Sequence, residues 1–202
     1  MSSTRSARAA LLAGALGLAL ATAPAQAEPV KLEIDAQHST VGFKVRHLFT
    51  KVAGQFRRFE GTIAFDPASL AASSVSVTIQ ADSVDTNVEA RDKDLVSKRF
   101  FDVAKFPTLT FVSTGISDVA AGKGKIRGTL TMHGVSREVV LDAQFLGSGK
   151  DPWGNQRYGF QAQVTINRKD FGMAWNEVVE AGGVLVGDEV EISLDVEAVP
   201  AS

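Results

Sequence analysis

The sequence contains no cysteine, which removes two means of stabilisation at once. Neither disulfide bonds nor thiolate-bound metal centres are available, so a hydrophobic core must stabilise the fold. The only histidines, His38, His47 and His133, are far apart in the sequence and form no helical i, i+4 pair that would indicate a metal site. Nothing favours a haem held by His47 with Met132 or His133. We therefore expect no resident metal or other cofactor.

An excess of basic residues is also missing. The chain has 21 Lys and Arg residues against 23 Asp and Glu residues, and the basic residues are scattered. Nucleic-acid-binding proteins usually carry a basic patch or stripe, so we expect no nucleic-acid partner. No glycine-rich phosphate loop precedes a predicted helix, which argues against a nucleotide site.

The one long apolar run lies at the N-terminus and has the features of a cleaved leader. Arg5 and Arg8 precede about a dozen apolar residues, fewer than the roughly 20 that a membrane-spanning helix requires. A small-x-small sequence, Ala-Gln-Ala, then ends at Ala27. We interpret residues 1–27 as a signal peptide cleaved after Ala27, with a membrane anchor as the alternative. The mature protein, 28–202, is expected in the periplasm or as a secreted protein.

Residues 28–202 are interpreted as a single domain built almost wholly from β-strands. Apolar and polar side chains alternate with a period of two in roughly eight or nine segments, as in strands with one buried face. Turn sequences such as FDPAS, AAGKG and GSGKDPWGN separate these segments. The segments are 30–35, 39–48, 55–65, 74–82, 109–113, 125–134, 137–145, 157–167 and 188–197.

One helix is expected among the strands, near residues 87–97. Thr86 and Glu89 have the spacing of a capping box, in which each side chain satisfies a backbone N–H group of the first helical turn. Leu95 and Val96 supply an apolar side beside a charged one.

Strands with one apolar face must bury that face, and a closed barrel or a sandwich can do so. We favour an antiparallel β-barrel of about eight strands, because closure removes exposed edges. Small residues stand among large aromatic ones on the inner faces, which suits an unfilled interior but does not exclude a packed core. The small positions are Gly61, Ala81, Gly128, Ala143 and Ala162.

An ordered set of motifs resembles the YceI-like family of exported bacterial proteins. It runs from IDAQHSTVGFKVRHL through VAGQFRRFEGTIAFDP, ARDKDLVSKRFFDVAKFPTLTFVST and IRGTLTMHGVSREVVL to INRKDFG and GDEVEISLDVEA, and so covers 32–198. The resemblance implies an extended lipocalin-like barrel with a helix against it, and an apolar tunnel that holds a polyisoprenoid, a quinone-like molecule or a similar amphiphilic lipid.

The tunnel that the resemblance implies should be lined by the apolar faces of the strands and of the helix. The chain has 12 Phe against 1 Tyr and 2 Trp, so most of its aromatic rings carry no polar group. We predict ligand contacts for Phe43, Val45, His47, Ile63, Phe65, Ile79, Leu95, Phe100, Phe101, Phe106, Phe111, Leu130, Met132, Phe160, Val164, Phe171 and Trp175.

His47 continues the apolar face of the segment 39–48, where a hydrophobic residue is expected. One interpretation is structural: the imidazole bonds to the backbone or to a carboxylate such as Asp92 at the barrel rim. The other is that His47 meets a lipid headgroup at the tunnel mouth, where one polar group orients the ligand. Both interpretations place His47 at a rim.

A hydrolase is the alternative of another class. It would use Ser39 as the nucleophile, a histidine such as His38 as the base, and Asp92 or Asp170 to orient that base. The pattern is weak, because neighbours in a strand point to opposite faces and no G-x-S-x-G motif is present.

The remaining polar residues of these motifs have two interpretations. Arg91, Asp92, Arg168 and Asp170 are better explained as an ion-pair network between the helix and the strand ends. Attraction of an anionic headgroup by Arg91 or Arg168 stays open.

We therefore predict a lipid-binding protein without catalytic activity, which sequesters, carries or stores a polyisoprenoid or similar long-chain lipid. The alternatives are a hydrolase of lipid esters or amides and a packed structural or stress-protective module. The expected partner is a hydrophobic small molecule, with transient contact to a membrane or to membrane redox proteins, and a homodimer is left open.

Overall fold

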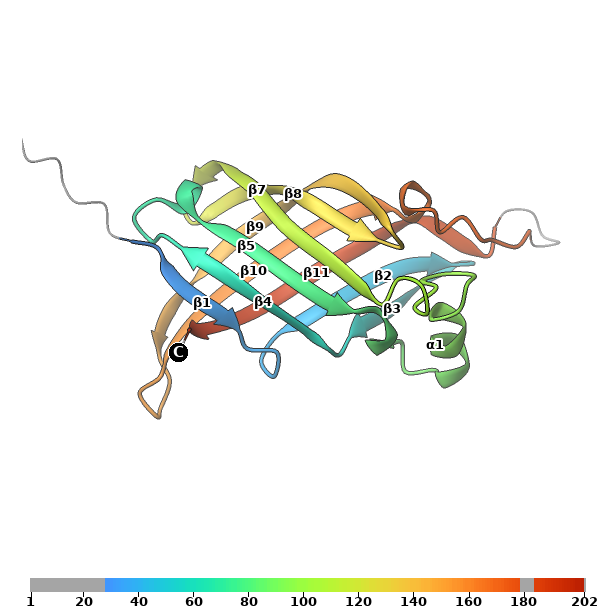
Figure 1. The fold of residues 1–202 in the computed structure, drawn as a ribbon, viewed down its shortest axis with the longest axis horizontal. Helices are drawn as coiled ribbons and strands as arrows, with labels where there is room; N and C mark the ends of the chain where they lie inside the picture. Colours follow the sequence, from blue (N-terminus) through green and yellow to red (C-terminus); the bar gives the residue numbers. More distant parts are fainter. Residues whose placement is uncertain (1–27, 179–183, 202) are drawn as a thin grey trace, which may run out of the picture.

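The computed structural model describes residues 28–178 and 184–201, in which strands wrap into an elongated barrel (Figure 1). The expected all-β fold is confirmed, and the leader at 1–27 lies outside the described residues. No helix within the described ranges is long and apolar enough to cross a membrane. The strands are β1 (Val30–Ile34), β2 (Thr40–His47), β3 (Thr50–Phe56), β4 (Phe59–Phe65), β5 (Ser74–Gln80), β6 (Val84–Asp85), β7 (Thr108–Ala120), β8 (Lys123–Met132), β9 (Val135–Lys150), β10 (Gln156–Asn167) and β11 (Val186–Pro200). The helical segments are α1 (Glu89–Leu95) and the 3-10 turns η1 (Leu70–Ala72), η2 (Ala81–Ser83) and η3 (Arg168–Phe171).

The eleven strands occupy only eight positions around the closed barrel. Each of three positions is shared by two short strands that lie end to end. β1 and β2 follow each other along one edge of β11, with Ile34 opposite Ala198 and Val41 opposite Leu194. β4 and β3 lie beside β1 and β2 in the same way, and β5 and β6 form the next position. Antiparallel pairing then continues from β5 through β7, β8, β9 and β10 to β11. The pairing of β1 with β11 closes the sheet into a barrel, and β6, which pairs with β3, ends the strand order.

Several strand boundaries differ from those expected, and two of these differences have a clear cause. The segment 55–65 is interrupted at Arg57 and Arg58, whose backbone N–H groups donate to the backbone carbonyl and to the hydroxyl of Ser83. β3 therefore ends before this break and β4 begins after it. The segment 109–113 extends as β7 to Ala120, because β8 pairs along its length through two register shifts.

The helix lies within the expected range, but the expected capping box does not form. Val88 is the N-cap residue, and no side chain caps it. Thr86 instead donates both its backbone N–H and its hydroxyl to the carboxylate of Asp92. Arg91 donates to the hydroxyl and the carbonyl oxygen of Thr86, at 2.7 and 2.8 Å. These bonds attach α1 to the chain that precedes it.

The two ends of the barrel differ in the elements that they carry (Figure 1). The helix end holds α1, the β2–β3 turn at Leu48 and Phe49, and the residues 172–178 that follow η3. The terminal end is where β1 begins and β11 finishes, and it also holds η1 and the β7–β8 turn. Buried apolar side chains form one cluster that includes Phe171 and another around Leu32.

Candidate ligand-binding cavity

Two apolar chambers lie inside the barrel and adjoin each other. The helix-end chamber contains about 1310 Å³ and the terminal-end chamber about 900 Å³ of space free of protein atoms, part of it open to solvent. Because several residues line both chambers, the chambers meet inside the barrel. These shared residues are Ile34, Val77, Phe111, Leu141, Leu194 and Val196.

Most residues predicted from the sequence as tunnel lining do line these chambers. Their contact with a ligand stays a prediction. Phe111 borders both chambers, and Ile63, Phe65 and Phe160 border the terminal-end chamber. The helix-end chamber is bordered by Phe43, Val45, Ile79, Leu95, Phe100, Phe101, Leu130, Met132 and Val164.

Three predicted aromatic residues do not line either chamber. Phe171 is 1% exposed and packs into the core cluster beside η3. The ring of Phe106 lies 4.8 Å from that of His133, on the β8–β9 turn. Trp175 lies edge-on against Phe100, and the guanidinium of Arg99 stands over its ring. These residues lie outside the strands, where apolar and polar side chains do not alternate. The alternation therefore could not predict where their side chains point.

His47 ends β2 and is half-buried, beside the turn to β3. It is not among the residues that line the chambers. Of the structural interpretation, only the example of Asp92 is contradicted, since the Asp92 carboxylate bonds to Thr86. A contact between His47 and a lipid headgroup stays a prediction.

Several lining residues were missed among the predicted contacts. Leu141, Val190, Ile192, Leu194 and Val196 lie on inward faces that the alternation had already identified, so the pattern was sufficient to find them. Met173 and Val186 follow η3 and begin β11, where no periodic signal exists. Other missed lining residues are Val41, Phe56, Phe59, Leu109 and Ile166.

A row of small side chains widens the terminal-end chamber. Gly124 of β8 lies opposite Ala143 of β9, which lies opposite Ala162 of β10. All three residues line this chamber. Large side chains at these neighbouring inward positions would fill the space that the small ones leave.

Aromatic side chains cluster around Phe65 beside the terminal-end chamber. The Phe65 ring centroid lies 4.8 Å from that of Phe145 and 5.4 Å from that of Phe160, with Tyr158 at 5.7 Å. Phe65, Phe145 and Phe160 line the chamber. The wall that a ligand would meet here is therefore almost wholly hydrocarbon.

Arg168 is the one charged residue among those that border the helix-end chamber. Its side chain is buried, and its guanidinium donates to the carbonyl oxygens of Met173, Trp175 at 2.8 Å and Gly187 at 2.9 Å. It also lies 3.3 Å from the Asp188 carboxylate. Burial lowers the pKa of Arg168, and the charge of Asp188 opposes that shift. Because its donors bind Met173 and Trp175 on one side and Gly187 on the other, Arg168 joins the chain that follows η3 to the start of β11.

The predicted ion-pair network between the helix and the strand ends does not form as one network. Arg91 and Asp92 bond to Thr86, next to their own helix, whereas Arg168 bonds around the start of β11. Asp170 is exposed on η3.

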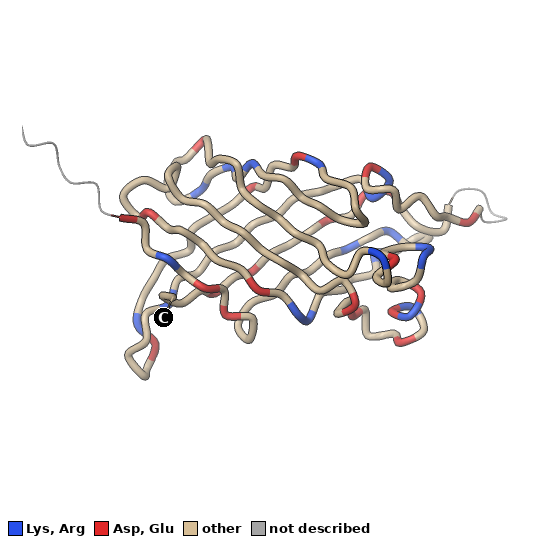
Figure 2. The backbone as a smooth tube through the Cα atoms, in the orientation of Figure 1, with Lys and Arg blue, Asp and Glu red and all other residues tan. Residues whose placement is uncertain are grey.

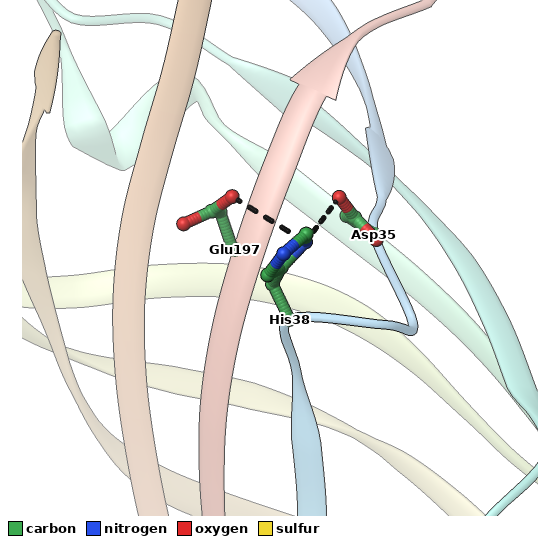
Figure 3. Close-up of side chains that lie close together, drawn as sticks. All are labelled: Asp35, His38 and Glu197. Carbon is green, nitrogen blue, oxygen red and sulfur yellow. Dashed lines mark hydrogen bonds and ion pairs between the residues drawn. The ribbon is translucent and has the colours of Figure 1, made fainter. Parts of the chain in front are cut away.

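Ser39 is held by the backbone of β11. Its hydroxyl donates to the carbonyl oxygen of Glu197 at 3.2 Å and accepts from the Glu197 N–H at 3.0 Å. The neighbouring His38 instead turns its Nδ1 to Asp35, at 2.8 Å, and lies 3.9 Å from the Glu197 carboxylate (Figure 3). Ser39 borders neither chamber, so the arrangement needed for a nucleophile and its base in the tunnel is not formed.

Asp35, His38 and Glu197 lie as close together as the ligands of a metal ion, but Arg157 already supplies a cation there. Its Nη1 lies 2.7 Å from Asp35 and 3.2 Å from Glu197. The hydrogen bond from His38, followed by that from Arg157, lowers the pKa of Asp35 against the opposing effect of burial. This cluster joins the β1–β2 connection to β10 and β11.

Comparisons with known proteins agree on one family. The YceI-like domain model matches residues 32–198. The protein YceI of Salmonella arizonae is 40% identical over 183 residues, which cover 90% of this chain and 92% of that protein. Among solved structures, BcnA of Burkholderia cenocepacia has a TM-score of 0.73 at 26% identity and covers 82% of this chain and 99% of its own. A polyisoprenoid binding domain from Saccharophagus degradans has a TM-score of 0.62 at 18% identity, with 85% and 99% coverage, which is a likeness of fold.

Proposed function

Because the chain belongs to the YceI-like domain family, we propose that it binds the hydrocarbon chain of a polyisoprenoid or similar long-chain lipid inside its barrel. The two adjoining apolar chambers are the observation that carries this proposal. Each CH₂ group that leaves water for such a space contributes about 0.8 kcal/mol. A long prenyl chain can therefore bind tightly without directed hydrogen bonds along its length.

The chemistry of the lining supports a binding role without catalysis. Arg168 donates to backbone carbonyl groups and to Asp188 rather than into the chamber. Ser39 bonds to the backbone of Glu197. The polyisoprenoid binding domain of Saccharophagus degradans, which shares the fold, supports the choice of ligand class. We propose no resident cofactor.

The predicted leader at 1–27 supports a site of action in the periplasm or outside the cell. There the protein would sequester, store or carry its lipid between membranes, because an aqueous compartment does not dissolve such a molecule. The polar headgroup would lie outside the apolar part of the chambers.

The experiment that tests this function is organic extraction and mass spectrometry of the mature protein, purified from the periplasm without detergent. We expect a prenyl or other long-chain lipid in near-stoichiometric amount. Protein that is free of lipid, and that also fails to take up added polyprenol, would show that the chambers are not a binding site.

A further inference from the structure

The two chambers meet at a waist, which is formed by side chains from β1, β5, β7, β9 and β11. The residues that border both chambers define this waist: Ile34, Val77, Phe111, Leu141, Leu194 and Val196. All of these side chains are apolar and offer no hydrogen bond to a polar group of a ligand. The part of a lipid that can occupy the waist is therefore its hydrocarbon chain.

Two glycines lie beneath the side chains of the waist. A Cβ atom on Gly61 of β4 would stand 2.8 Å from Cδ1 of Ile34 and 3.0 Å from Cγ2 of Val77. A Cβ atom on Gly128 of β8 would stand 2.6 Å from Cε2 of Phe111. Because neither glycine has a side chain, the three waist side chains can lie along the barrel wall. This arrangement keeps the passage between the chambers open.

The strands that form one side of the waist also lack charge. β5 contains no charged residue, and β7 contains none between Thr108 and Ser117 (Figure 2). Val77 and Phe111 lie opposite each other on these two strands. A charged headgroup would find no ion-pair partner on this part of the wall, so it has to remain outside while the chain passes through the waist.

The two chambers together are longer than an ordinary acyl chain. Along β7, Leu109 borders the helix-end chamber and Val119 borders the terminal-end chamber. The strand between these residues measures about 34 Å, and a tilt of roughly 40° to the barrel axis reduces this length to about 25 Å. The acyl chains of a phospholipid span one leaflet, or about 15 Å of the hydrocarbon core of a bilayer. Only a longer chain would extend through both chambers.

We propose that the waist selects the ligand by the length of its chain. The hydrocarbon passes through the waist and occupies both chambers, and Ile34, Val77 and Phe111 are specificity-determining residues. This inference rests on the proposed function and names the chain that the function requires. A chain in both chambers withdraws more CH₂ groups from water than a chain confined to one of them. Long prenyl chains should therefore be bound in preference to short prenyl chains and to the acyl chains of phospholipids.

The test is competition between a short and a long prenyl alcohol, farnesol and solanesol. Both are offered together to the full mature protein, in excess over any bound lipid and from one cyclodextrin carrier. Wild-type protein should bind more solanesol than farnesol. Val77→Phe adds a ring opposite Phe111 and narrows the waist. It should lower the ratio of bound solanesol to bound farnesol about 10- to 100-fold, because the chain loses its contacts beyond the waist.

Two further variants accompany Val77→Phe. Leu194→Phe narrows the waist from β11 and should lower the same ratio, so the test does not depend on the folding of one variant. Val112→Phe is the matched control, because Val112 follows Phe111 on β7 but is 50% exposed. The control should leave the ratio unchanged.

Native mass spectrometry of the same mixtures shows which chains share one protein molecule. A molecule that holds solanesol should hold no farnesol, because a chain through the waist leaves neither chamber free. Molecules that hold both alcohols would overturn the inference and leave the proposed function standing. The same conclusion would follow if wild-type protein preferred farnesol, if both waist variants kept the wild-type ratio, or if Val112→Phe lowered it equally. Wild-type protein that binds neither alcohol would overturn the inference, and the proposed function with it if extraction also yields no lipid.

Discussion

The ring of Phe111 in β7 lies over Gly128 in β8, so that a Cβ atom on Gly128 would stand 2.4 Å from the ring Cζ. Phe111 borders both chambers, at the place where they meet. The same relationship joins Phe43 to Gly54 of β3, where a Cβ atom would also stand 2.4 Å from the ring. In each pair the glycine gives the ring room to lie along the barrel wall, which leaves the interior open.

The first prediction follows from this pair. Gly128→Ala should displace the Phe111 ring toward the chambers and destabilise the protein by about 1–3 kcal/mol, as other overpacked cores are destabilised. A Cβ atom at Gly128 would also meet the carbonyl oxygen of Val112 at 2.6 Å, which the backbone cannot easily relieve. Urea unfolding measures the change. Gly149→Ala is the control, because no atom lies within 4 Å of its added Cβ, and an equal loss there would refute the explanation.

The second prediction concerns the row of small residues. Ala162→Phe should fill the terminal-end chamber and exclude two or three CH₂ groups of the ligand, which weakens binding about 10- to 100-fold. Lipid content after extraction, together with affinity for added polyprenol, measures the effect. Gln163→Phe places the same ring on the exposed outer face and should retain the lipid. If Ala162→Phe kept full lipid content and affinity, the terminal-end chamber would not hold the ligand.

The third prediction tests the buried guanidinium. Arg168→Met would leave the carbonyl oxygens of Met173, Trp175 and Gly187 without their donor, at a cost of about 3 kcal/mol or more in the free energy of unfolding. Lys169→Met is the control, since Lys169 is exposed and pairs with the same Asp188 carboxylate. An exposed pair contributes at most about 1 kcal/mol. Similar losses in both variants, measured by urea unfolding, would contradict a clamping role for Arg168.

The fourth prediction concerns acid. Burial opposes ionisation of Asp151, but hydrogen bonds from Asn155, Arg157 and the Trp153 N–H outweigh it and lower the Asp151 pKa to about 2. In the unfolded chain an aspartate titrates near pH 3.9. The stabilisation is therefore complete above about pH 4 and is lost as the pH falls through about 2. Asp151→Asn should lower Tm at pH 7 and flatten the fall of Tm between pH 4 and 2. An unchanged slope would show that this carboxylate does not contribute to acid lability.

Much of the fold could be predicted because its signal is local. Alternation in segments such as 137–145 and 157–167 identifies which side chains face inward, and it places Ala143, Phe160, Ala162 and Val164 on the cavity wall. The preference for a barrel followed from the need to remove sheet edges. The predicted lining was least accurate where the chain leaves its strands, as at Phe106, Phe171 and Trp175, because a loop has no period that fixes the direction of a side chain.

The polar contacts depend on residues that are distant in the sequence. Ser39 bonds to Glu197, and Arg157 joins Asp35 to Asp151. Nothing in the neighbourhood of Ser39 distinguishes a nucleophile from a hydroxyl that satisfies a backbone group. Likewise, the residues next to Arg168 in the sequence do not show that its guanidinium is bound by the carbonyl oxygens of Met173, Trp175 and Gly187.

The sequence by itself determined the fold class, the inward faces of most strands and the apolar character of the interior, because these follow from the alternation and type of neighbouring residues. Only the tertiary structure decided how β1 and β2 share β11, where the two chambers meet, and which polar groups are satisfied within the protein. Those features depend on strand register and on the closure of the barrel, which bring together residues from opposite ends of the chain.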